Sequence, residues 1–209
     1  MRQYKADGKV RDAQMVSISE RMGPQRTFMF FALIGSSVLF LSLVIMFIIW
    51  MSYHPPIQNL ELPKAFIVST IVLLFSSYLL TMARRAFLKD NGRALLISLF
   101  STLLLSATFT YLQVSGWKEL YQSGHFFDGA AGVTFLYLIT GLHFVHVFGG
   151  IIYLIYLNLL AFDTWQDPVK SLLYFSNPVE GIRLELFSAY WHFLDGLWLF
   201  LFLTFLFTL

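Results

Sequence analysis

The stretch AAGVTFLYLITGLHFVHVFGGIIYLIYLNLLAF, residues 130–162, is a run of 33 residues without a Lys, Arg, Asp or Glu. About 20 apolar residues are enough for a helix to cross the hydrocarbon core of a bilayer. The apolar residues run on without the two-residue alternation that is typical of barrel strands, so the stretch predicts a membrane-spanning helix. Its extra length requires the helix to tilt or to protrude from the bilayer.

The composition of the whole chain agrees with a membrane protein. Of its 209 residues, 57% are hydrophobic and only 12% are charged, whereas a soluble fold needs a more highly charged surface. The chain has no cysteine, which excludes disulfides, iron–sulfur clusters, c-type haem attachment and thiolate-bound copper.

Four further apolar runs are long enough to cross a membrane, and each is bounded by polar or turn-forming residues. They cover residues 28–50, 65–83, 94–114 and 186–209. We therefore predict an all-α integral membrane protein with five transmembrane helices. An N-terminal tail of residues 1–27 precedes a single transmembrane domain that covers residues 28–209.

The basic residues predict how the chain is oriented in the membrane. Of the 14 Lys and Arg residues, all except Lys64 and Lys118 lie in the N-terminal tail, in the loop after the second span or in the loop after the fourth. Cytoplasmic loops carry an excess of Lys and Arg. The N-terminus is therefore expected in the cytoplasm and the C-terminus, after five crossings, on the opposite side. Topology and lipid head groups account for these charges, and we expect no nucleic-acid partner.

Two histidines lie inside the fourth span, at His143 and His146. A spacing of three residues places them about 60° apart on one face of a helix. Gly141, Gly149 and Gly150 lack side-chain bulk, so they allow another helix to approach closely. The fourth span therefore has a predicted helix-packing face that also carries imidazoles.

Asp195 is the one carboxylate deep inside a span, and His192 lies on the same side of its helix. A central Asp costs about 2.5–3.5 kcal/mol on insertion scales, so we expect it to face the interior of the helix bundle. We predict a buried, hydrogen-bonded structural cluster of His143, His146, His192 and Asp195 that joins the fourth and fifth spans. We assign no catalytic, metal-binding or cofactor-binding residue.

Three other interpretations of these side chains remain open. His143 or His146 could ligate a haem together with His192, the three imidazoles could bind copper, or Asp195 could serve a proton or ion path. A dinuclear carboxylate centre needs several Glu residues, and no span contains one. One Asp and three His do not form a chain across about 30 Å of membrane, so a packing role is favoured.

Two motifs resemble a known family. TGLHFVHVFGG at residues 140–150 resembles the pattern G-x-H-x-x-H-V-x-x-G, and AYWHFLDGLWLFLF at 189–202 resembles Y-W-H-F-x-D-x-x-W-L-F. Together they are similar to subunit III of the haem–copper terminal oxidases, which include cytochrome c oxidases and related quinol oxidases. The resemblance covers roughly residues 60–209. It fits the five-span bacterial form, which lacks the first two of seven spans.

The resemblance implies an accessory subunit of an aerobic respiratory oxidase, without haem or copper of its own. Haem and copper would lie in partner subunits, and phospholipid could bind to this chain. The implied role is to stabilise the catalytic subunit I and to support proton uptake during oxygen reduction. The implied partners are subunit I, subunit II, other small subunits, membrane lipids and a supercomplex with a quinol:cytochrome c oxidoreductase. The implied location is the bacterial inner membrane, with the C-terminus in the periplasm.

Some features of the sequence depart from this family or leave its function open. Ser37 stands at a position that is often acidic in the family, and Gln113 lacks the Glu that usually follows it. The sequence does not distinguish a cytochrome c oxidase subunit from a quinol oxidase subunit. Alternatives from other classes are a small proton-coupled transporter that uses Asp195 and a haem-binding membrane electron carrier.

Overall fold

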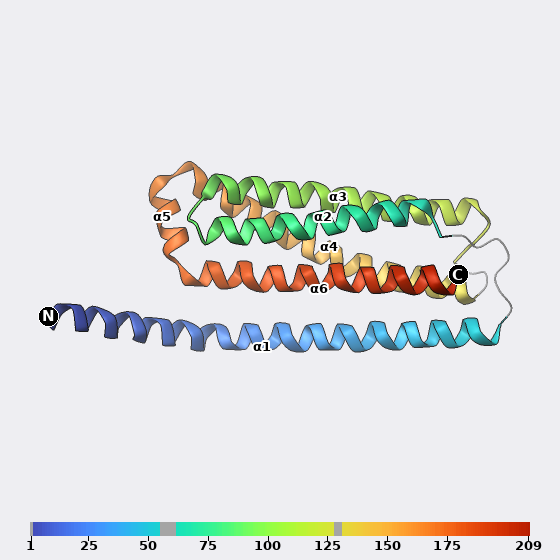
Figure 1. Ribbon diagram of the computed structural model, residues 1–209, viewed down its shortest axis with the longest axis horizontal. Coiled ribbons are helices and arrows are strands. Elements are labelled where there is room, and N and C mark those ends of the chain that lie inside the picture. Colours follow the sequence, from blue (N-terminus) through green and yellow to red (C-terminus); the bar gives the residue numbers. More distant parts are fainter. Residues whose placement is uncertain (1, 55–61, 128–130) are drawn as a thin grey trace.

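The computed structural model describes residues 2–54, 62–127 and 131–209, with side chains from residue 23 onward. Every regular element in these ranges is a helix (Figure 1). The helices are α1 Arg2–Tyr53, α2 Lys64–Phe87, α3 Gly92–Gln122, α4 Ala131–Gln166, α5 Pro168–Ser176 and α6 Pro178–Thr208.

Five helices in the described part of the chain are long and apolar enough to cross a membrane, which confirms the predicted all-α fold with five spans. In α1 the apolar part is Gly23–Tyr53, and the helical backbone begins at Arg2. The helices are longer than the predicted spans because hydropathy marks only the part in hydrocarbon, whereas a helix can continue into the head-group layer.

The last helix begins well before its predicted start at residue 186. Asn177 caps it, because the Asn177 side chain accepts a hydrogen bond from the Val179 N–H at 3.1 Å. Pro178 occupies the first turn, where its missing N–H costs nothing. This early start adds more than two turns to α6 ahead of the apolar run.

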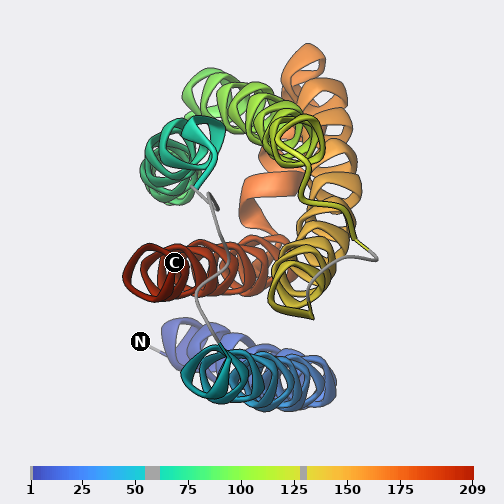
Figure 2. The ribbon, with the colours of Figure 1, turned by 90° about the vertical axis from the view of Figure 1, so that its right-hand side faces the viewer.

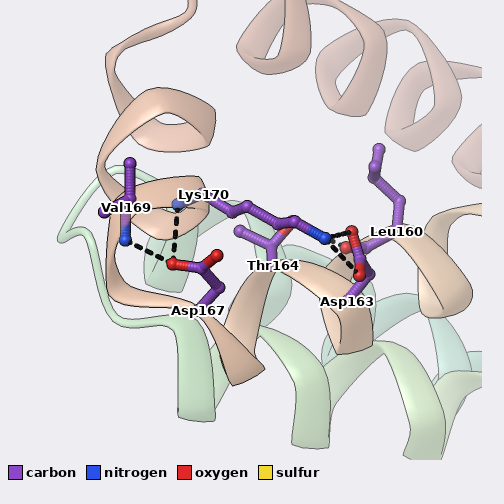
Figure 3. A network of polar contacts seen from close by, with 6 residues as sticks. All are labelled: Leu160, Asp163, Thr164, Asp167, Val169 and Lys170. Atoms are coloured by element: carbon purple, nitrogen blue, oxygen red, sulfur yellow. Dashed lines mark hydrogen bonds and ion pairs between the residues drawn. The ribbon is translucent and has the colours of Figure 1, made fainter.

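The short helix α5 between α4 and α6 was not predicted. Its N-terminus is capped by Asp167, whose Oδ1 accepts from the N–H groups of Val169 and Lys170 (Figure 3). Lys170 Nζ also forms an ion pair with Asp163 at 2.7 Å, and the hydrogen bond to this carboxylate raises the pKa of Lys170. Local capping of this kind stabilises a helix that is too short to be recognised by periodicity.

The long helices form a bundle in which α2 packs on α3 and α6, and α4 packs on α3 and α6. Helix α1 lies along the outside of this group and contacts α6 and α4 (Figure 2). The N-terminus and α5 lie at one end of the molecule and the C-terminus at the other (Figure 1). We call the first of these the α5 end. Glu185 of α6 lies there between Arg26 of α1 and Arg84 of α2, at 3.8 and 3.7 Å.

Aromatic side chains fill the centre of the bundle. Trp198 of α6 is fully buried, and its ring centroid lies 5.7 Å from that of Phe66 and 5.5 Å from that of Phe109. The outer surface carries large apolar side chains such as Phe28 and Phe31, which are mostly exposed. An apolar exterior around a packed aromatic core is the arrangement expected of a helical membrane protein.

Candidate functional site

His143 lies at the centre of the bundle and is completely buried. Its ring centroid is 5.1 Å from that of Trp198, 6.1 Å from that of Phe109 and 6.4 Å from that of Phe40. Neither ring nitrogen has a hydrogen-bond partner among the described residues. Helices α1, α3 and α6 therefore all contact this imidazole through aromatic rings.

His146 lies one turn further along α4 and is directed toward α1. Its Nδ1 lies 2.8 Å from the carbonyl oxygen of Leu142, and its Nε2 lies 3.4 Å from the hydroxyl of Ser36. The Nδ1–H donates to that carbonyl, since a carbonyl oxygen can only accept. The His146 side chain thus joins α4 to α1, while its backbone carbonyl oxygen accepts from the Tyr190 hydroxyl of α6 at 2.9 Å.

His192 of α6 is exposed on the outside of the bundle beside α2. Its Nδ1 lies 2.6 Å from the Ser77 hydroxyl and its Nε2 lies 3.4 Å from the Thr81 hydroxyl. Two further side chains of α6 bond to α2 in the same way. Trp191 Nε1 donates to Ser76 at 3.2 Å, and Trp198 Nε1 donates to Thr70 at 3.0 Å.

Asp195 is buried in α6, with 5% of its surface exposed. In the described part of the chain neither carboxylate oxygen has a hydrogen-bond partner. The Ser77 hydroxyl is nevertheless close enough to interact with the carboxylate. A buried carboxyl group with so little hydrogen bonding is costly, so this position differs from an ordinary packing site.

These positions correct the single cluster that we expected from the sequence. Among the residues that the structure describes, no hydrogen bond joins any two of His143, His146, His192 and Asp195. The hydroxyl groups that bond to two of the imidazoles belong to α1 and α2. The sequence gave no sign of which helix these hydroxyl groups would face.

The three glycines of the fourth span also differ in their surroundings. A Cβ atom added to Gly150 would lie 3.0 Å from Trp191 and 3.2 Å from Tyr190, so α4 and α6 approach closely there. Around Gly141 and Gly149 no atom lies within 4 Å of such a Cβ atom among the described residues. The close approach expected at all three glycines is thus found at Gly150 alone.

Substitution of Gly150 and Gly149 by alanine should therefore have different effects. Trp191 is buried and cannot move aside, so Gly150→Ala is expected to lower the free energy of unfolding by about 1–3 kcal/mol. Gly149→Ala is expected to be neutral or to stabilise by about 0.4–1 kcal/mol, because alanine restricts the unfolded chain. Reversible unfolding in mixed micelles measures both values. Equal effects would contradict the close helix contact.

Gly149 and Gly150 also line a pocket of about 670 Å³ between α1, α4 and α6. Its walls are largely apolar, and include Phe28, Met29 and Phe187. Polar side chains lie toward the α5 end, where Gln25 and Arg183 belong to the lining. Arg183 also forms an ion pair with Glu180 at 2.8 Å.

Both histidine motifs and most of the pocket lie within a region that matches a known family. The sequence model described as "Cytochrome c oxidase subunit III" matches residues 26–208. The chain belongs to the cytochrome c oxidase subunit III family. This confirms the resemblance carried by the two motifs. All four polar residues of the predicted cluster fall within the matched region.

Known members of the subunit III family match most of this chain. The cytochrome c oxidase subunit 3 of Hippopotamus amphibius is 34% identical over 151 residues, which are 71% of this chain and 51% of the relative. The subunits 3 of Canis lupus familiaris and Equus caballus are 34% and 33% identical over 149 residues, with the same coverage. The chain thus spans about half the length of the curated relatives that it matches.

At the position where members of the subunit III family often carry an acid, this chain has an exposed serine. The Ser37 hydroxyl donates to the carbonyl oxygen of Leu33 in its own helix at 2.8 Å. Gln113, at the second departure from the family pattern, is buried and donates to the hydroxyl of Ser69 at 2.9 Å. The serine therefore bonds to a neutral group where the resemblance leads us to expect an acid, and Val114, which follows Gln113, carries no polar side chain.

Proposed function

We propose that this chain is a non-catalytic subunit III of a haem–copper terminal oxidase of the cytochrome c oxidase type. It stabilises subunit I and supports proton uptake during oxygen reduction in the aerobic respiratory chain. Subunit I is its main partner, with subunit II, other small subunits and a quinol:cytochrome c oxidoreductase supercomplex as further partners. The observation that carries this proposal is the family match over residues 26–208, which includes both histidine motifs.

The imidazoles of this chain do not fit as ligands of haem or copper. His143 is surrounded by aromatic rings, and the ring nitrogens of His146 and His192 already face hydroxyl or carbonyl groups. In the ranges that the structure describes, no group of three or more His, Cys, Asp or Glu side chains could hold a metal ion. This geometry supports a role in which partner subunits hold the redox groups.

The charge distribution supports a location in the bacterial inner membrane with the α5 end in the cytoplasm. The basic side chains Arg84, Arg85 and Arg93 flank the loop between α2 and α3 at that end, whereas Lys64 begins α2 at the other. An excess of basic residues favours the cytoplasmic side. The C-terminus then lies in the periplasm.

The pocket between α1, α4 and α6 is the proposed site for a membrane phospholipid. Its volume falls in the range of small-molecule sites. Its apolar walls suit an acyl chain, and Gln25 and Arg183 could contact a head group. Filling the pocket with Gly149→Leu is expected to remove one lipid from the purified protein, as measured by native mass spectrometry. Gly35→Leu, at another glycine with open surroundings, is the control that should retain the lipid.

Copurification tests the proposed function. The tagged chain, extracted in mild detergent, is expected to carry with it larger subunits, an a- or o-type haem spectrum and oxygen consumption. Reduced cytochrome c and quinol are supplied separately as electron donors, and cytochrome c is the donor expected to support the activity. A chain that purifies alone and catalyses proton-coupled transport in proteoliposomes would refute the assignment.

A further inference from the structure

An aromatic pocket of about 620 Å³ lies where α3 ends, at the end of the bundle opposite the α5 end (Figure 1). Helix α3, the segment that follows it and the first turns of α4 form its walls. Its described lining includes five aromatic rings and one cation, which belong to Trp117, Tyr121, Phe126, Phe127, Tyr137 and Lys118. None of the described lining residues is acidic, so aromatic rings provide most of the contacts for a bound group.

The segment that follows α3 is held in place by hydrogen bonds to its backbone. Gly124 adopts a φ of 87°, a left-handed conformation that glycine takes without strain, and this turns the chain at the end of α3. The His125 N–H then donates to the carbonyl oxygen of Leu120 at 3.1 Å. Further on, the Thr134 hydroxyl of α4 donates to the carbonyl oxygen of Phe127 at 2.7 Å. The segment that carries two of the five rings is therefore fixed against both neighbouring helices.

Four of the rings form two nearly perpendicular pairs. The ring centroids of Tyr121 and Phe126 lie 4.8 Å apart, with an angle of 80° between the ring planes. Those of Phe127 and Tyr137 lie 6.1 Å apart, with an angle of 73°. The Tyr137 hydroxyl donates to the carbonyl oxygen of Trp117 at 3.2 Å, which joins the second pair to α3. Rings that meet at such angles form corners, so a small group in the pocket can contact aromatic surface on several sides.

We propose that this pocket binds the phosphocholine head group of a membrane lipid. Aromatic rings attract cations through their quadrupole, and quaternary ammonium groups are the cations that aromatic cages recognise. A trimethylammonium group has no N–H that needs an acceptor, so it loses no hydrogen bond among apolar rings. The primary ammonium of an ethanolamine head group would leave N–H groups unpaired in the same place, which costs free energy. The lining thus favours choline over ethanolamine.

Lys118 supplies the partner for the phosphate of such a head group. It belongs to the lining, it is exposed, and it takes part in no ion pair with a described residue. An ammonium group beside aromatic rings complements a zwitterion in which a phosphate and a quaternary ammonium group are adjacent. The charges of the pocket and of phosphocholine therefore match.

The apolar surface next to the pocket indicates a lipid rather than a soluble choline compound. Val114 also lines the pocket, about one turn of α3 closer to the middle of the membrane span, and it is 48% exposed. Tyr111 lies three residues further along the same face and is 71% exposed. An acyl chain can follow these side chains from the head group into the hydrocarbon layer. The site lies at the opposite end of the bundle from Gln25 and Arg183, so it is separate from the lipid pocket of the proposed function.

Native mass spectrometry of the intact purified complex, stripped of its own lipids by detergent, tests the proposal. Dioleoylphosphatidylcholine and dioleoylphosphatidylethanolamine are added separately, and the affinity of each is measured. Phosphatidylcholine is expected to bind more tightly by about fivefold or more. The double variant Tyr121→Ala, Phe126→Ala is expected to abolish this preference, because it removes one pair of exposed rings. Phe100→Ala removes an exposed ring of α3 outside the pocket and should keep the preference.

Lys118→Gln separates the phosphate contact from the aromatic contact. Both lipids carry a phosphate, so this variant is expected to weaken both about threefold and to leave the preference for choline unchanged. Wild-type affinities in Lys118→Gln would overturn the phosphate contact. Equal affinities of the two lipids for the wild type, or an unchanged preference in the double variant, would overturn the choline site. Glycerophosphocholine, which lacks acyl chains, is the third ligand, and the assignment to a lipid fails if it binds as tightly as phosphatidylcholine.

Discussion

Replacement of Trp198 by alanine is expected to lower the free energy of unfolding by about 3–5 kcal/mol. The indole is fully buried and packs against the rings of Phe66, Phe109 and His143. These contacts join four of the five spans, and alanine would leave a cavity among rigid aromatic rings. The lost Nε1 hydrogen bond to Thr70 adds to the effect.

Reversible unfolding of the purified full chain in mixed micelles measures this change. Trp198→Phe keeps most of the ring volume, so it should cost only about 1–2 kcal/mol for the lost hydrogen bond and the smaller ring. Trp165→Ala is the matched control, because Trp165 is half exposed and its loss should change stability little. Equal losses in the free energy of unfolding for Trp198→Ala and Trp165→Ala would contradict the packing of Trp198 in the aromatic centre of the bundle.

Gly116→Ala is expected to cost about 1–3 kcal/mol, although it adds a single methyl group. A Cβ atom at this position of α3 would meet the ring of Phe66 at 2.3 and 2.7 Å, which is closer than atoms can approach. Phe66 cannot turn away, since it is fully buried and packs edge-on against Trp198. The substitution therefore forces α2 and α3 apart.

Gly141→Ala provides the comparison, because its added methyl group meets no described atom within 4 Å. It should be neutral or slightly stabilising, since alanine favours helices over glycine by about 1 kcal/mol. The double variant Gly116→Ala, Phe66→Leu should be more stable than the sum of its single variants predicts, because a smaller side chain relieves the clash. Strict additivity would show that the two residues do not meet.

The sequence predicted the parts of the fold that depend on long-range averages of hydropathy. All five spans appear where apolar runs occur. Trp191 shows the limit of this reasoning. It lies close to the start of the last apolar run, where hydropathy alone places a membrane interface, but it is buried. Helix α6 begins earlier than the run, so Trp191 lies several turns inside it.

The candidate site was predicted only in part, because hydrogen bonds depend on which faces of different helices meet. The sequence identified the histidines and Asp195 as unusual within the membrane. It could not assign Ser36 to His146 or Ser77 to His192, since these pairs lie more than 100 residues apart. Helix α5 was not predicted for a local reason, because its 9 residues are too few to carry a periodic signal.

Separation of this chain from the purified complex provides the most direct test of the claim that redox chemistry occurs elsewhere. The absorption spectrum is recorded for the complex, for the chain released by a stronger detergent and for the remaining subunits. We expect all haem absorbance and all bound copper to stay with the remaining subunits. Haem or copper that stays with this chain, and is lost on replacement of His143, His146 or His192, would contradict the account.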